Sequence, residues 1–153
     1  MLDIGDTLQK FDLPTNGDGT LSNKNIKGKK VILYFYPKDM TPGCTTESED
    51  FRDNLKAFQK ADTMIIGVSK DSVVRHDKFV AKHDLPFQLI SDETGTLCED
   101  FGVWVEKNMY GRKYMGIQRA TFLIDASGKI AQAWQKVKVK GHVSAVLEAS
   151  KAL

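Results

Sequence analysis

The amino-acid sequence predicts an α/β fold in which a mixed central sheet is flanked by helices. Three observations support this class. Short apolar, β-branched runs alternate along the chain with longer amphipathic segments, which is typical of strands that alternate with helices. The last two predicted strands are joined by a short turn, so they should pair antiparallel. The 153 residues match the ordinary size of one domain, and we expect residues 1–153 to form a single domain.

The first elements are a short hairpin and a buried strand. Residues 11–14 lead into a turn at 15–20 that contains Asn-Gly and Asp-Gly pairs, and these pairs favour tight turns. Residues 31–36 are continuously apolar and rich in β-branched and aromatic side chains, which predicts a strand buried on both faces. Pro37 ends this strand.

A helix follows from Thr41 to about Lys60. Thr41 suits the N-cap position and Pro42 suits the first helical position, which places Cys44 third in the helix. Backbone N–H groups in this first turn have no helical partners, and the helix dipole is positive there. Such a setting favours the thiolate form of a cysteine.

The remaining elements alternate in the same way. Strands are predicted at 63–68, 87–90, 120–124 and 130–139, with a turn at 125–129. Helices are expected at about 72–84 and 96–101, and a terminal amphipathic helix is marked by Val143, Val146, Leu147 and Leu153. The glycine-containing segment with Trp104, Met109, Tyr110, Tyr114 and Met115 is expected to be a solvated loop, with a partner or dimer surface as the alternative. This order suits a thioredoxin-like sandwich, and the pattern alone leaves a flavodoxin-like sheet open.

Composition excludes several classes of protein. The net charge is only +2, which does not favour binding to nucleic acid. Lys136, Lys138 and Lys140 alternate along a predicted strand, where lysines usually protect a sheet edge from pairing with another chain. No nucleic-acid partner is therefore expected. The apolar runs are too short to span a membrane, and the N-terminus does not resemble a signal peptide. Two cysteines cannot form a disulfide scaffold, which favours a reducing compartment and predicts a cytoplasmic protein. His76, His83 and His142 lack ligand spacing, so no metal site is expected.

Helical phase places Cys44 on a buried face. At about 100° per residue, Phe51, Leu55 and Phe58 each fall within roughly 40° of Cys44. A cysteine on an apolar face is often only a small core residue. Here the preceding Thr-Pro-Gly leaves little side-chain bulk around the sulfur and supplies free N–H groups, which favours a reactive thiol in a pocket.

This region resembles a known family. Pro37, Thr41 and Cys44 match the Pro-x-x-x-Thr-x-x-Cys signature of peroxiredoxins. The string Tyr-Phe-Tyr-Pro-Lys-Asp-x-Thr-Pro-Gly-Cys-Thr-Thr-Glu at 34–47 is similar to the peroxiredoxin Q group, also called the bacterioferritin comigratory protein group. Further similar segments lie at 91–92, 101–104, 119–125 and 137–142, so the resemblance covers nearly the whole chain.

The resemblance implies a thioredoxin-like fold and a thiol-dependent peroxidase that reduces hydrogen peroxide and organic hydroperoxides without a metal or organic cofactor. It implies that Cys44 is the peroxidatic thiol and Arg119 the active-site arginine. Thr41 would hydrogen-bond the thiolate and the peroxide, and Pro37 would shield the pocket. Gly43 is a further candidate because its N–H group could face the substrate, and Glu47 matches a position that the family usually fills with Glu.

The chain departs from the family pattern in its second cysteine. Many members of the group carry a resolving cysteine five residues after the peroxidatic one, where this chain has Glu49. A second variant places it about 36 residues on, where this chain has Val80. Only Cys98 remains, and its place beside the apolar face of a short helix also fits a buried core thiol. We expect recycling mainly by an external thiol, with a Cys44–Cys98 disulfide as the alternative.

Two other functions are alternatives to the peroxidase. A thioredoxin-type disulfide oxidoreductase lacks support because the chain has no Cys-x-x-Cys motif. A redox sensor or chaperone-like binding protein would consume peroxide stoichiometrically rather than catalytically. The expected partners are a hydroperoxide and a reductant that is thioredoxin, glutaredoxin or a small thiol, and the expected state is a monomer or weak homodimer.

Overall fold

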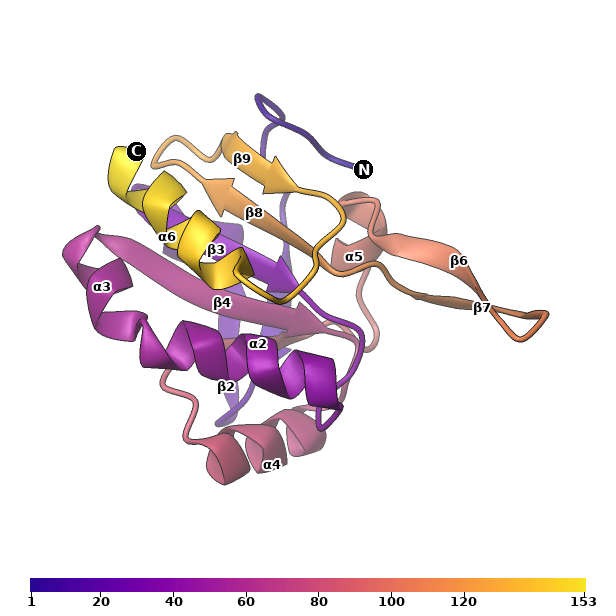
Figure 1. Ribbon diagram of the computed structural model, residues 1–153. Helices are drawn as coiled ribbons and strands as arrows, with labels where there is room; N and C mark the ends of the chain where they lie inside the picture. Colours follow the sequence, from indigo (N-terminus) through magenta and orange to yellow (C-terminus); the bar gives the residue numbers. More distant parts are fainter.

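A seven-stranded sheet forms the centre of the computed structural model, which describes residues 1–153 (Figure 1). The strand order is β2-β1-β5-β4-β3-β8-β9. β3, β4 and β5 run parallel, whereas β1, β2, β8 and β9 pair antiparallel with their neighbours, so the predicted mixed sheet is confirmed. The strands are β1 (Asp12–Thr15), β2 (Gly19–Ser22), β3 (Lys30–Phe35), β4 (Thr63–Ser69), β5 (Gln88–Ser91), β8 (Ala120–Ile124) and β9 (Ile130–Trp134).

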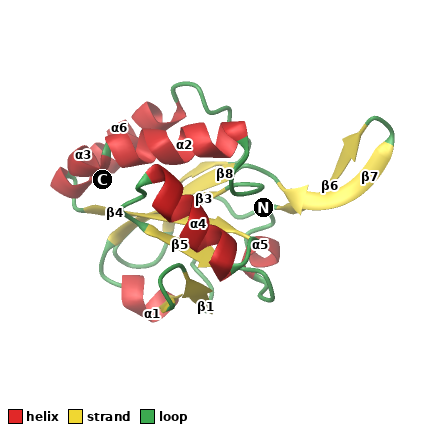
Figure 2. Ribbon diagram, turned by 90° about the horizontal axis from the view of Figure 1, so that it is seen from below, coloured by secondary structure: helices red, strands yellow, loops and turns green.

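Helices cover both faces of this sheet. Side chains of β3 alternate between two separate hydrophobic clusters, as expected for a strand buried on both sides. Figure 2 shows α2, α3 and α6 on one side of the sheet and α1 and α5 on the other. α4 packs on the same cluster as α2 through Phe79. The helices are α1 (Asn23–Ile26), α2 (Pro42–Asp53), α3 (Leu55–Lys60), α4 (Val73–His83), α5 (Leu97–Asp100) and α6 (His142–Ala152).

Two predicted elements differ from the structure in length. The helix expected from Thr41 to Lys60 is interrupted at Asn54, whose side-chain amide donates to the Asp50 carbonyl and whose φ of −105° is not helical. The strand expected at 130–139 ends at Trp134, so Lys136, Lys138 and Lys140 do not lie on an edge strand.

The segment at 104–117 is a β-hairpin, and the expectation of a loop was wrong. β6 (Trp104–Met109) pairs with β7 (Arg112–Ile117) and projects from the body of the molecule (Figure 1). Tyr110 and Gly111 both have positive φ, 53° and 79°, which is the two-residue turn that suits a twisted hairpin. The apolar side chains Met109, Tyr110, Tyr114 and Met115 are exposed on it.

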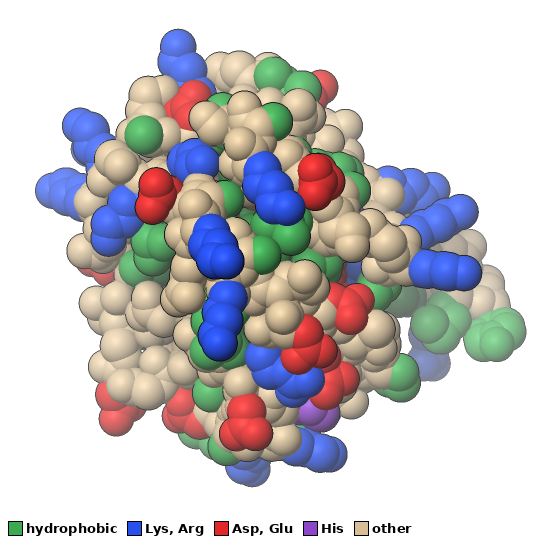
Figure 3. Space-filling model, turned by 60° about the vertical axis from the view of Figure 1, so that its left-hand side comes forward, with side chains coloured by type: hydrophobic (Ala, Val, Ile, Leu, Met, Phe, Trp, Pro, Cys, Tyr) green, Lys and Arg blue, Asp and Glu red, His purple; other side chains and the backbone are tan.

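Charge is dispersed on the face shown in Figure 3. Lys and Arg side chains are interspersed there with Asp and Glu. No helix of the structure is both long enough and apolar enough to cross a membrane.

Candidate active site

Cys44 lies in the first turn of α2, where the sequence predicted it. Thr41 is the N-cap residue, Pro42 opens the helix, and the Cys44 side chain is 1% exposed. The helix is docked on β3 by Phe51, whose ring stacks on Tyr34 with centroids 4.6 Å apart. The hydroxyl groups of Tyr34 and Ser48 share a hydrogen bond of 2.9 Å. These contacts turn the sulfur toward the buried side of the helix.

Arg119 reaches the sulfur from the residue before β8. Its Nη2 donates to Cys44 Sγ at 3.2 Å, and its Nη1 donates to Glu47 Oε1 at 2.7 Å. Burial opposes the guanidinium charge, but Glu47 and Cys44 outweigh burial and raise the pKa of Arg119. A side chain at Gly43 would press on this group, because an added Cβ would lie 3.3 Å from Arg119 Nη2. Glycine therefore leaves room for the arginine.

Glu47 is a buried carboxyl group with one unpartnered oxygen. Burial raises its pKa to about 7, although the nearby Arg119 charge lowers it. Its Oε2 has no hydrogen-bond partner and lies 4.0 Å from His142 Nε2. Burial, and then the charge of Arg119, lower the pKa of His142 to about 4, so the imidazole is neutral at pH 7 and forms no ion pair with Glu47. Its Nε2 is instead 2.8 Å from the Thr121 hydroxyl.

Thr41 and Pro37 flank the helix start from the loop before it. The Thr41 hydroxyl donates to the Lys38 carbonyl at 2.8 Å and does not cap the helix N–H groups. Because the hydroxyl hydrogen is engaged by the Lys38 carbonyl, the Thr41 oxygen can still accept a hydrogen bond from another group. Pro37 is half-buried where β3 passes into the loop.

Cys98 lies on the opposite face of the sheet from Cys44. The two thiols are free, and each belongs to a different hydrophobic cluster. Cys98 is fully buried at the start of α5, where its own N–H group and that of Leu97 donate to the Asp92 carboxylate. Burial and the neighbouring Asp92 raise the pKa of the Cys98 thiol far above its ordinary value. The structure thus places Cys44, Arg119, Glu47 and Gly43 together and leaves Cys98 apart.

Three residues around this site were not predicted from the sequence. His142 packs beside Glu47, and His76 is paired with the carboxylate of Asp39, in the loop before α2. Lys107 lies over Gly116 on the hairpin. Burial lowers the pKa of Lys107, and the charge of Arg119 lowers it further. Metal-ligand spacing could not find the histidines because neither is part of a local motif. A family motif did mark residues 137–142, which was the available signal for His142.

Comparison with known proteins identifies the family. A family model described as AhpC/TSA matches residues 4–133. The chain belongs to the AhpC/TSA family. Peroxiredoxin Bcp of Bacillus subtilis is 49% identical over 150 residues, which cover 98% of this chain and 96% of that protein.

Solved structures agree with this assignment. A cysteine variant of Xylella fastidiosa PrxQ superposes with a TM-score of 0.94 at 41% identity, covering 99% of this chain and 97% of that one. The bacterioferritin comigratory protein of Xanthomonas campestris gives a TM-score of 0.90 at 46% identity. The match covers 96% of this chain and 98% of that one. The expected resemblance to peroxiredoxin Q and the thioredoxin-like fold are confirmed, and the flavodoxin-like alternative is wrong. The protein is a thiol-dependent peroxidase.

Proposed function

We propose that Cys44 is the thiol that reacts with the hydroperoxide. The hydrogen bond from Arg119 Nη2 to Cys44 Sγ carries this assignment, because it brings a fixed positive charge to one buried sulfur. No hydrogen bond from a cation reaches the Cys98 sulfur. The charge of Lys70 lowers the pKa of this thiol, but burial and Asp92 outweigh it and raise the pKa, which keeps Cys98 a neutral thiol and a weak nucleophile.

The proposed reaction is a displacement at oxygen. The Cys44 thiolate forms an S–O bond with one peroxide oxygen, the O–O bond breaks, and the second oxygen leaves with a proton as water or an alcohol. Cysteine is oxidised to sulfenic acid and the peroxide is reduced. The Arg119 guanidinium and the N–H groups of Gly43 and Cys44 are the donors that stabilise the charge developing on oxygen. Glu47 orients Arg119, Thr41 accepts a hydrogen bond from the peroxide, and Pro37 borders the pocket.

An external thiol restores Cys44 in this proposal. The central sheet separates the two cysteines, so a Cys44–Cys98 disulfide would require the elements carrying them to leave their clusters. A resolving thiol must also attack as thiolate, and the raised pKa of Cys98 opposes this. Glu49 and Val80, where family variants carry the resolving cysteine, have no sulfur.

We extend this proposal to substrates, reductant and setting. The Xanthomonas campestris relative has alkyl peroxide reduction activity, which supports organic hydroperoxides beside hydrogen peroxide as substrates here. The reductant is thioredoxin, glutaredoxin or a small thiol. Dependence on such a thiol favours a reducing compartment, for which we propose the cytoplasm. We also propose that residues 1–153 act as one domain, as a monomer or weak homodimer.

Substitution of Cys44 by serine tests the assignment. Cys44→Ser should abolish peroxidase turnover with a thiol reductant while leaving the circular dichroism spectrum unchanged. Cys98→Ser is the matched control, since it removes the other buried thiol. Retention of more than a few per cent of activity by Cys44→Ser would show that another residue reacts with peroxide.

A further inference from the structure

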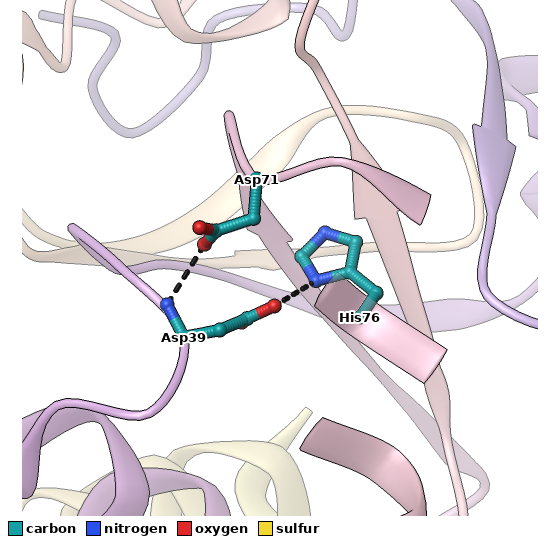
Figure 4. A group of neighbouring side chains, drawn as sticks. All are labelled: Asp39, Asp71 and His76. Carbon is teal, nitrogen blue, oxygen red and sulfur yellow. Dashed lines mark hydrogen bonds and ion pairs between the residues drawn. The ribbon is translucent and has the colours of Figure 1, made fainter. Parts of the chain in front are cut away.

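Asp39 anchors the loop between β3 and α2 to the neighbouring part of the fold. Its carboxylate accepts from the Tyr36 hydroxyl at 2.5 Å and lies 2.6 Å from His76 Nδ1 in α4. Its backbone N–H donates to Asp71 at 2.8 Å (Figure 4). Its carbonyl accepts from Arg75 at 3.2 Å. The Asp39 side chain is fully buried. One loop residue thus uses its side chain and both backbone groups to hold the loop.

This cluster is a hydrogen-bonded anchor rather than a cation site. The carboxylate oxygens of Asp71 accept from the Ser69 hydroxyl and from Arg75 Nε, in addition to the Asp39 N–H. Those of Asp39 are engaged by Tyr36 and His76. A cation would have to displace these donors and would face the guanidinium of Arg75 directly.

His76 joins Asp39 to the central sheet. Its Nδ1 lies 2.6 Å from a carboxylate oxygen of Asp39, and its Nε2 lies 3.0 Å from the Ile90 carbonyl in β5. Both ring nitrogens therefore have a polar partner, and the side chains of His76 and Asp39 are fully buried.

The anchored loop leads directly to the reactive helix turn. Met40 follows Asp39 with a φ of 67°, a left-handed conformation that a residue with a side chain adopts only where its surroundings enforce it. Lys38, on the other side of Asp39, supplies the carbonyl that accepts from Thr41. Movement of Asp39 would therefore displace Thr41 and the first turn that carries Cys44.

We propose that Asp39 and His76 are positioning residues, which hold the loop and the first turn of α2 in the conformation that reacts with peroxide. Neither touches the peroxide. Their contact also keeps the Cys44 sulfur buried, so a reagent larger than a peroxide reaches it only when the contact opens. This inference rests on the proposed reaction at Cys44 for its kinetic consequence, whereas the burial of the sulfur can be tested without peroxide.

Two substitutions at His76 separate the anchor from general stability. His76→Leu removes both ring nitrogens. His76→Asn is the matched control, because its side-chain amide can stand where Nδ1 stands and donate to Asp39. For His76→Leu we expect oxidation of Cys44 by hydrogen peroxide to slow by about 10- to 100-fold, as displaced reacting groups do. Labelling of Cys44 by a bulky maleimide should accelerate at least ~10-fold. His76→Asn should stay within about threefold of the parent in both rates.

Cys98 provides an internal control for unfolding. It is fully buried on the other face of the sheet, so release of the loop exposes Cys44 alone, whereas global unfolding exposes both thiols. The labelled residue is identified by peptide mass spectrometry. Where His76→Leu labels both thiols, Asp39→Ala tests the same contact from the loop side and should show the selective exposure.

The outcomes distinguish this inference from the proposed function. Three results would overturn the inference. In the first, folded His76→Leu and Asp39→Ala keep the labelling and oxidation rates of the parent. In the second, both of these variants expose Cys98 as much as Cys44, and in the third His76→Asn behaves as His76→Leu does. Selective exposure of Cys44 in a protein whose Cys44 does not react with peroxide would support the anchor and refute the proposed function.

Discussion

Glu47→Gln should change how stability depends on pH. The substitution keeps the size of the side chain and an oxygen that can accept from Arg119, and it removes the titrating group. Burial raises the pKa of Glu47 from 4.5 to about 7 in the folded protein. Between these two values the folded state binds more protons than the unfolded state, so the stability of the parent falls as the pH rises from about 4.5 to about 7.

The size of the effect follows from the two pKa values. At 1.36 kcal/mol per pKa unit, a pKa of about 7 against an ordinary 4.5 corresponds to about 3 kcal/mol. The parent should lose this amount relative to Glu47→Gln between pH 4 and pH 8. His142 acts in the opposite direction, since its pKa of about 4 lies below the ordinary 6.5 and its burial makes stability rise with pH across that interval. Both proteins contain His142, so the difference between their free energies of unfolding reports the titration of Glu47 alone.

The assay is urea unfolding of both proteins at pH 4, 5, 6, 7 and 8, followed by tryptophan fluorescence. The quantity compared is the free energy of unfolding of Glu47→Gln minus that of the parent. We expect it to rise from pH 4 to pH 8, most steeply between about pH 4.5 and about pH 7. A difference that stays constant within about 1 kcal/mol over this range would refute the reasoning, because it would mean that the Arg119 ion pair fully offsets the burial of the carboxylate.

Three further predictions concern the reaction. Arg119→Ala should slow the oxidation of Cys44 by hydrogen peroxide at least ~100-fold. The fraction of Cys44 present as thiolate is measured in parallel. If a fall in this fraction explains the whole loss of rate, Arg119 does not stabilise the transition state. Gly43→Ala should slow the same step several-fold, since the added methyl group would lie 3.3 Å from Arg119 Nη2, while thermal unfolding is unchanged or occurs at a higher temperature. Cys98→Ser should retain turnover with thioredoxin and with a small thiol; loss of thioredoxin-driven turnover with continued sulfenic acid formation would make Cys98 the resolving residue.

Local patterns predicted most of the fold and the position of Cys44 in the first turn of α2. The apolar run at 31–36 and the Thr-Pro pair before Gly43 each specify their element within a few residues, so β3 and the start of α2 were found. The β6–β7 hairpin was missed because its strands are largely exposed and polar, which leaves Tyr110-Gly111 as its main signal. The break at Asn54 coincides with a side-chain hydrogen bond to the Asp50 carbonyl, a contact that helix propensity does not reveal.

The polar surroundings of the site could not be predicted from local patterns. His142 meets Glu47 only because α6 packs against α2, and His76 meets Asp39 because α4 begins beside the loop that follows β3. These pairs are far apart in the sequence and show no periodicity. The separation of the two cysteines likewise follows from strand alternation across the sheet, which assigns α2 and α5 to opposite faces.

The arrangement around Arg119 explains why a helix start alone would not produce a fast peroxidase. Lowering the pKa of any cysteine from ~8.5 to ~6 raises its thiolate fraction at pH 7 about 30-fold. With a Brønsted slope of ~0.45, the same change costs about 13-fold in nucleophilicity, so the net gain is only about twofold. The remaining acceleration must come from donors that act on the breaking O–O bond. In the mechanism we propose, Arg119 is this donor: one end of its guanidinium donates to Glu47 and the other end donates to Cys44 Sγ. The proposed role of the Asp39–His76 contact is to hold the helix turn where these groups converge.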